Sequence, residues 1–161
     1  MLSQINSLLG INVQLANDGD AAIMAELFYS TRPTFYQLGL PQTAVDILLR
    51  QQYRLQQMSY KNHFPRASDY ILRLQTQVIG KLTLETGSQY MHLVDFVIAP
   101  DMRGKGFGSA VLEALKCDAK TLKTPIRLSV ALDNPRAHAL YLKQDFIVQA
   151  VSETHQSMQW E

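Results

Sequence analysis

The segment that decides the fold has the sequence FVIAPDMRGKGFGS and runs from Phe96 to Ser109. It leads from an apolar strand through a basic, glycine-rich turn into a stretch with helical spacing of apolar residues. Glycines let backbone N–H groups approach a ligand without a Cβ in the way. The first N–H groups of a helix have no intrahelical partner and lie at the positive end of its dipole. The segment therefore predicts a phosphate or diphosphate site, beside which Arg103 and Lys105 add positive charge.

This turn allows three other interpretations. The glycines could serve only a tight strand-to-helix connection, with the two cations solvated. A Walker loop needs a glycine five residues before Gly104 and a serine or threonine after Lys105, but those positions hold Ala99 and Gly106. The dinucleotide fingerprint would put its third glycine where Ser109 stands, and too little chain follows for a second nucleotide-binding half. The Walker loop is excluded, the dinucleotide site is disfavoured, and the purely structural turn stays open.

Outward from this segment, the spacing of apolar residues changes between the period of a strand and that of a helix. A proline after Arg32 ends the first helix, and Asn134 caps the last one with a proline in its first turn. The order predicts an α/β fold, a mixed sheet with helices on both faces. Strands are predicted over residues 11–15, 69–74, 77–85, 89–98, 126–132, 146–151 and 156–160, and helices over residues 21–31, 41–60, 106–123 and 134–144.

The composition bounds the function. The chain has 161 residues with 15 basic and 14 acidic side chains, so its net charge is +1. No excess positive charge is available for wrapping nucleic acid, and no polybasic run for an anionic membrane, so we expect neither partner. Residues 1–10 lack the basic start of an export signal, and the single cysteine fits a reducing compartment, so we expect a cytoplasmic protein. We expect one domain over residues 1–161.

Two motifs at compatible spacing resemble one known family. Residues 103–108 resemble the R-G-x-G-x-G/A acyl-CoA diphosphate loop of the GNAT superfamily of N-acetyltransferases, and Pro100 stands where that family often has a proline. The sequence NPRAHALYLKQDF, residues 134–146, is similar to the family's N-x-x-A-x-x-L-Y-x-x-x-G-F segment. One position departs, because Asp145 replaces the glycine; aspartate tolerates the left-handed conformation better than most residues. The order of elements is also the family's, so the resemblance covers essentially the whole chain.

The resemblance implies a GNAT-like, mostly antiparallel sheet of about seven strands with about four helices on both faces. It also implies acetyl-CoA as the acyl donor, bound between the strand ending at Ile98 and the strand over residues 126–132, with its acetyl carbonyl at the backbone of Val97 and Ile98. Tyr141 is the family-matched proton donor to the departing thiolate, although it could merely pack. The implied CoA-binding residues are Val97, Ile98, Arg103, Gly104, Lys105, Gly106, Phe107, Gly108, Ser109, Asn134 and Tyr141.

An amine acceptor arrives mostly as ammonium, so a group must accept its proton. By strand alternation His92, Val94, Phe96 and Ile98 share one face, and His92 lies where some family members carry the base. Asp95 falls on the opposite face unless a bulge intervenes. It remains a substitute, as do Glu85 and a water-mediated route, and His92 could equally be a histidine without a catalytic role.

The resemblance assigns the acceptor cleft to the N-terminal helix pair, which presents Arg32, Tyr36, Tyr53 and Tyr60. Aromatic walls and one arginine favour a small-molecule amine or an amino-acid-like acceptor, although several of these aromatics could be simple packing. No histidines have metal-ligand spacing, so we expect no metal. A homodimer is also compatible with the sequence. An enzyme is the first hypothesis, and a non-catalytic acyl-CoA-binding module is the alternative.

Overall fold

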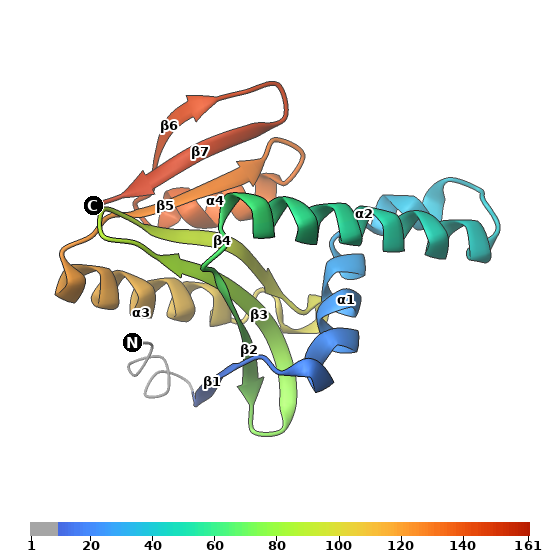
Figure 1. The fold of residues 1–161 in the computed structure, drawn as a ribbon, viewed down its shortest axis with the longest axis horizontal. Helices are drawn as coiled ribbons and strands as arrows, with labels where there is room; N and C mark the ends of the chain where they lie inside the picture. Colours follow the sequence, from blue (N-terminus) through green and yellow to red (C-terminus); the bar gives the residue numbers. More distant parts are fainter. Residues whose placement is uncertain (1–9) are drawn as a thin grey trace.

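The computed structural model describes residues 10–161, which form one seven-stranded sheet and four α-helices (Figure 1). Residues 1–9, on which the expectation about an export signal rests, lie outside the described residues. The strands are β1 (Ile11–Leu15), β2 (Ser68–Leu74), β3 (Gln77–Thr86), β4 (Met91–Ile98), β5 (Ile126–Ala131), β6 (Ile147–Val151) and β7 (His155–Trp160). The helices are α1 (Ala21–Ser30), α2 (Gln42–His63), α3 (Phe107–Leu122) and α4 (Pro135–Lys143), with short 3₁₀ helices η2 (Asp18–Asp20), η3 (Pro33–Gln37) and η4 (Pro100–Met102).

The order of strands across the sheet is β1-β2-β3-β4-β5-β7-β6. Every neighbouring pair is antiparallel except β4 and β5, which are parallel. The predicted mixed, mostly antiparallel sheet is therefore confirmed, and each predicted element is present with its ends displaced by at most a few residues. Among the described residues, no helix is both long enough and apolar enough to cross a membrane.

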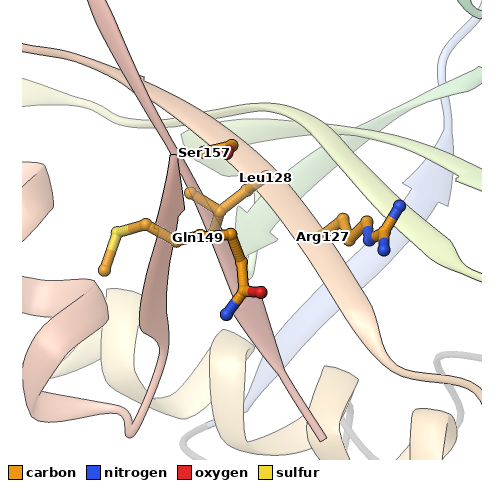
Figure 2. A pocket seen from close by; sticks show the side chains of 5 residues that line it. Arg127, Leu128, Gln149 and Ser157 are labelled. Carbon is orange, nitrogen blue, oxygen red and sulfur yellow. The ribbon is translucent and has the colours of Figure 1, made fainter. Parts of the chain in front are cut away.

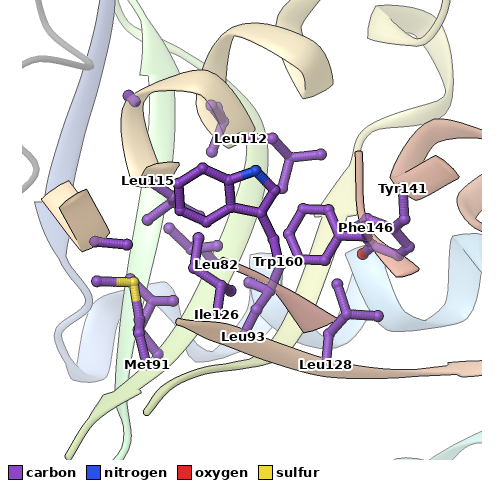
Figure 3. Packing of buried hydrophobic residues seen from close by; sticks show 14 of the residues in the cluster. Leu82, Met91, Leu93, Leu112, Leu115, Ile126, Leu128, Tyr141, Phe146 and Trp160 are labelled. Atoms are coloured by element: carbon purple, nitrogen blue, oxygen red, sulfur yellow. The ribbon is translucent and has the colours of Figure 1, made fainter. Parts of the chain in front are cut away.

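Helices cover both faces of the sheet, as predicted, with α2 and α3 on opposite sides (Figure 1). The larger core lies under α3, where Trp160 of β7 is surrounded by Leu112, Leu115 and Phe146 (Figure 3). The other face carries α1 and α2, whose buried side chains are outside that core cluster. These side chains are Leu27, Phe28, Val45 and Leu49, and the sheet contributes Ile71 and Val97 to the same face.

A β-bulge in β4 changes which side chains face which layer. Thr83 of β3 pairs with Asp95, but the next residue of β3 pairs with Leu93, so Val94 is an extra residue. Leu93 belongs to the core under α3, and Phe96, three residues later, packs against the same core. The prediction that His92 shares a face with Phe96 and Ile98 is therefore wrong. His92 and Asp95 both lie on the opposite face, toward α1 and α2.

The turn after α4 has the conformation that the sequence predicted. Asp145 has φ 67°, in the left-handed region, where the family's glycine would stand. The N–H of Phe146 donates to the carbonyl oxygen of Tyr141 at 3.0 Å, which closes the end of the helix. The aspartate thus keeps the turn at some cost in backbone strain.

Candidate active site

The candidate site lies where β4 and β5 separate. Their parallel pairing covers only Met91–Leu93 opposite Ile126–Leu128, and beyond it a cavity of about 670 Å³ opens between the strands. That volume is within the range of small-molecule and cofactor pockets. The cavity is lined by Ser30, Thr31, Arg32, Pro33, Thr34, Phe96, Val97, Ile98, Met102, Arg103, Gly104, Gly106, Gly108, Ser109, Ala131, Asp133, Asn134, Arg136, Ala137, Leu140, Tyr141 and Lys143.

The glycine-rich loop presents unpaired backbone donors to this cavity. Gly104 and Gly106 have φ +74° and +84°, which only glycine adopts without strain. The first bond inside α3 runs from the Ala110 N–H to the Gly106 carbonyl oxygen at 3.0 Å, and no side chain caps this helix. The N–H groups of residues 107–109 are therefore available to an anion. Gly108 has another role, because a Cβ there would lie 3.2 Å from Leu140 Cδ2, so this glycine lets α3 and α4 pack closely.

The two cations of the loop are placed differently. Arg103 lines the cavity, and its Nε donates to the Ile98 carbonyl oxygen at 2.9 Å, which ties its guanidinium to the end of β4. Burial lowers the pKa of Arg103, and the charge of Arg136 lowers it further. Lys105 is exposed and does not line the cavity, while Phe107 packs against the core. Of these loop side chains, the structure brings only Arg103 to the cavity.

The edge of β4 supplies one more donor. The Ala99 N–H bonds to the Ile79 carbonyl oxygen of β3 at 2.8 Å. Because N–H groups alternate in direction along a strand, the Val97 N–H also points to β3, and the Ile98 N–H points to the cavity side. The bond that Ile98 accepts from Arg103, outside the ladder, agrees with this direction. Of the two backbone positions predicted to meet an acetyl carbonyl, Ile98 is the one with a donor facing the cavity.

Tyr141 lies at the inner end of the cavity. Its side chain comes from α4, is 6% exposed and packs on Phe146 with ring centroids 5.6 Å apart. Burial raises the pKa of Tyr141 above its ordinary value, and the charge of Asp95 raises it further. The phenol is therefore protonated at neutral pH. Asn134 also lines the cavity, but its side-chain oxygen already accepts the Ala137 N–H at 3.2 Å as the cap of α4.

On the α1 and α2 face, the sheet carries a buried ion pair that we did not predict. Lys81 Nζ lies 3.1 Å from Asp95 Oδ2, and the lysine side chain is only 2% exposed. Burial opposes its charge, but Asp95 and Asp69 outweigh this effect and raise the pKa of Lys81. Asp69 in turn accepts a hydrogen bond of 2.5 Å from Thr83 Oγ1. The available signal was a lysine at the centre of the apolar run VIGKLTL, residues 78–84.

His92 lies on the same face but farther along β4. It packs against Phe64 with ring centroids 5.2 Å apart, and Glu85 is its cross-strand partner. Burial lowers the pKa of His92, Glu85 opposes this effect and Arg127 adds to it. His92 does not line the cavity, and four residues of strand, about 13 Å, separate it from Phe96.

The predicted acceptor residues divide into three groups. Arg32 lines the cavity, and its guanidinium lies over the Phe28 ring at 5.0 Å. Tyr53 and Tyr60 are half-buried beside the ion pair, and burial raises the pKa of both. The charge of Asp95 acts on both hydroxyls in the same direction. Tyr36 is 51% exposed, and the structure does not bring it to the cavity.

A second, smaller cavity of about 250 Å³ lies on β5, β6 and β7 (Figure 2). It is lined by Arg127, Leu128, Gln149, Ser157 and Met158, none of which is a predicted site residue. Arg127 is engaged elsewhere, because its guanidinium stacks 3.4 Å from the centroid of the Tyr90 ring. Within residues 10–161, no group of three or more His, Cys, Asp and Glu side chains is placed to hold a metal ion.

Comparisons with known proteins agree with this geometry. The model of the acetyltransferase (GNAT) family matches residues 26–146, and no curated protein matches the sequence. The fold is similar to PaiA N-acetyltransferase from Thermoplasma acidophilum in complex with coenzyme A, with a TM-score of 0.69, 17% identity, and coverage of 94% of this chain and 98% of that chain. It is also similar to an acetyltransferase from Thermus thermophilus, with a TM-score of 0.64, 20% identity, and coverage of 93% and 96%. A third similar structure is spermidine N-acetyltransferase from Vibrio cholerae in complex with CoA and spermine, with a TM-score of 0.63, 22% identity, and coverage of 93% and 94%. Because the family model covers most of its length, the chain belongs to the GNAT acetyltransferase family.

Proposed function

We propose that this protein transfers the acetyl group of acetyl-CoA to the primary amine of a small-molecule or amino-acid-like acceptor. The observation that carries the proposal is a single cavity that joins the loop donors at residues 104–109 to Ile98 and Tyr141. An anion-binding end and a proton-donating end in one cavity suit a ligand with a diphosphate at one place and a thioester at another. The two similar proteins that were crystallised with CoA add support.

The residues present fit acetyl-CoA. A Cβ at Gly106 would force a strained backbone at the helix end that offers the N–H groups, so the loop keeps glycine there. These donors and Arg103 would hold the diphosphate. The bound thioester supplies an activated acyl group. The Ile98 N–H would donate to its carbonyl oxygen as negative charge develops, and Tyr141 would give a proton to the departing sulfur.

The acceptor side offers two groups for the proton that the ammonium must lose. His92 has its pKa below the ordinary value of 6.5, so it is neutral at pH 7 and can accept a proton, which would have to reach it through a chain of several water molecules because His92 does not line the cavity. Asp95 does not itself line the cavity, but the next residue, Phe96, does, and the Asp95 carboxylate is held by Lys81. We assign proton acceptance to His92 and attraction of the cationic acceptor to Asp95. Arg32, at the cavity wall, would suit an acceptor that also carries a carboxylate.

A thiol-release assay with acetyl-CoA tests this function. The panel should contain amino acids, primary monoamines and spermidine, and the comparison variants are Tyr141→Phe, His92→Gln and Asp95→Asn. We expect release of CoA with at least one amine, a mass increase of that amine by one acetyl group, and an acid limb of kcat/KM below pH 6.5 that His92→Gln removes.

Two results would contradict the proposal. If acetyl-CoA binds but no amine is acetylated, the protein is the acyl-CoA-binding module that the sequence left as the alternative. If the acid limb survives in His92→Gln and disappears in Asp95→Asn, the proton goes to the carboxylate, and our division of roles between these two residues is wrong.

A further inference from the structure

We propose that Arg136 binds the ribose 3′-phosphate of CoA, so that this protein discriminates CoA from its 3′-dephospho form. The inference rests on the proposed function, because it assumes that the cavity takes CoA. It adds a phosphate-binding residue that lies outside the glycine-rich loop motif. Arg136 comes from the first turn of α4 and lines the cavity beside the glycine-rich loop.

The position of Arg136 is the first observation. A Cβ built on Gly104 would lie 3.9 Å from Arg136 Nη2, so the guanidinium covers the start of the loop at van der Waals distance. Both residues are exposed and form the outer rim of the cavity, whereas Tyr141 is buried at the inner end. Anything that leaves the loop toward solvent therefore passes Arg136.

The charges around the rim are the second observation. Arg103 and Arg136 are close enough for the charge of Arg136 to disfavour the protonated form of Arg103. Within the described part of the chain, neither guanidinium forms an ion pair with a carboxylate. Asp133 is the one acidic residue in the cavity lining, against four cations that also include Arg32 and Lys143. The excess of positive charge in the cavity lining favours a ligand with more than one negative group.

The two arginines are not equivalent. Arg103 is anchored by its bond to the Ile98 carbonyl oxygen, and it lies beside the helix N–H groups that would take the diphosphate. Arg136 has no hydrogen bond to any described residue, so its five donors are free. The thioester end must run inward to Tyr141, so the adenosine end runs outward past the rim. The remaining phosphate of CoA is on that end, as a monoester with close to two negative charges at neutral pH.

Calorimetric titration of the full chain with CoA and with 3′-dephospho-CoA tests the assignment. The variants are Arg136→Gln and, as a matched control, Arg50→Gln, which removes one exposed arginine from α2, outside the cavity lining. We expect the wild type and Arg50→Gln to bind CoA about 5- to 20-fold more tightly than the dephospho form at low salt. In Arg136→Gln the two ligands should bind within about twofold of each other.

Each of the other outcomes overturns the assignment in a distinct way. If the wild type binds both ligands equally, nothing recognises the 3′-phosphate. If Arg136→Gln weakens both ligands by the same factor, the residue holds the diphosphate instead. If the wild type binds neither ligand, the proposed function fails together with this inference. Raising the salt concentration should reduce the discrimination in the wild type, because exposed charges are screened.

Discussion

Replacing Gly80 by alanine tests whether the spacing between β3 and β4 positions the reactive end of the cavity. A Cβ on Gly80 would lie 2.3 Å from the Val97 carbonyl oxygen and 3.2 Å from Ile98 Cδ1. Ordinary contact begins at 3.4 Å, and 3.4 minus 2.3 leaves a separation of about 1 Å that the two strands must gain. The obstructing atom is backbone, so no side-chain rotation can relieve the clash.

We expect Gly80→Ala to lower both the stability of the fold and kcat. Overpacking of this kind costs about 1–3 kcal/mol, which for a chain of this length lowers the melting temperature by about 2–12 °C. Displacement of Ile98 by about 1 Å also moves the N–H that would face the acetyl carbonyl, and misplacement on that scale can cost about 100-fold in kcat. Binding of CoA at the loop should change little, since Gly106 and α3 are not displaced.

Thermal unfolding, CoA titration and thiol release on Gly80→Ala measure these three quantities. Gly39→Ala is the control, because Gly39 has φ +72° with no atom within 4 Å of a built Cβ. That variant should lose about 1–2 kcal/mol of stability through backbone strain and keep its kcat. Wild-type stability and kcat in Gly80→Ala would refute the argument that close strand contact fixes the position of Ile98.

Three more predictions follow from other contacts. Tyr141→Phe should lower kcat about 100-fold or more and leave the Kd of CoA within about twofold, and wild-type turnover would reassign the proton donor. Lys81→Met should destabilise the protein by about 1–3 kcal/mol in urea titration, because Asp95, itself 17% exposed, loses its partner; adding Asp95→Asn should recover part of this loss, and no recovery would contradict the ion-pair explanation. The backbone N–H before η2 and the Arg73 guanidinium hold the pKa of Asp20 below 3.8, so its stabilisation is present above about pH 4 and is lost as the pH falls through the folded-state pKa. Asp20→Asn should therefore be less stable than the wild type at pH 7, and this difference should shrink as the pH is lowered below 3.8; a difference that stays constant over that pH range would exclude this linkage.

The sequence was sufficient for the fold and for placing the glycine-rich loop at the cavity. Residues 103–109 and 134–146 carry local signals, since glycine conformation, helix capping and apolar periodicity depend on near neighbours in the chain. The element order then left few arrangements for a chain of this length. Even the left-handed turn at Asp145 could be predicted, because it is fixed by one residue and its neighbours.

The positions of the residues proposed for the acceptor could not be predicted from local sequence patterns. The side of β4 on which His92 and Asp95 lie depends on an extra residue in the pairing with β3, and pairing joins residues that are distant in sequence. Burial of Lys81 likewise depends on α2 and on a carboxylate from another strand. Tyr36 lies in η3, beyond the proline that ends the first helix, and the direction of its 51% exposed side chain is set by how this connection crosses the surface rather than by a local pattern.

The bulge at Val94 also bears on how the specificity of this family can be redesigned. Side chains alternate between the two faces of the sheet along β4, and the extra residue at Val94 reverses that alternation for the residues that follow it. A residue transplanted by counting from the start of β4 would land on the wrong side of the sheet. One transplanted by counting back from Ile98 would reach the intended layer only as far as Asp95. The face that a β4 side chain occupies therefore depends on its position relative to the bulge, and deletion of Val94 would restore simple alternation while leaving Leu93, Asp95 and Phe96 on their present faces.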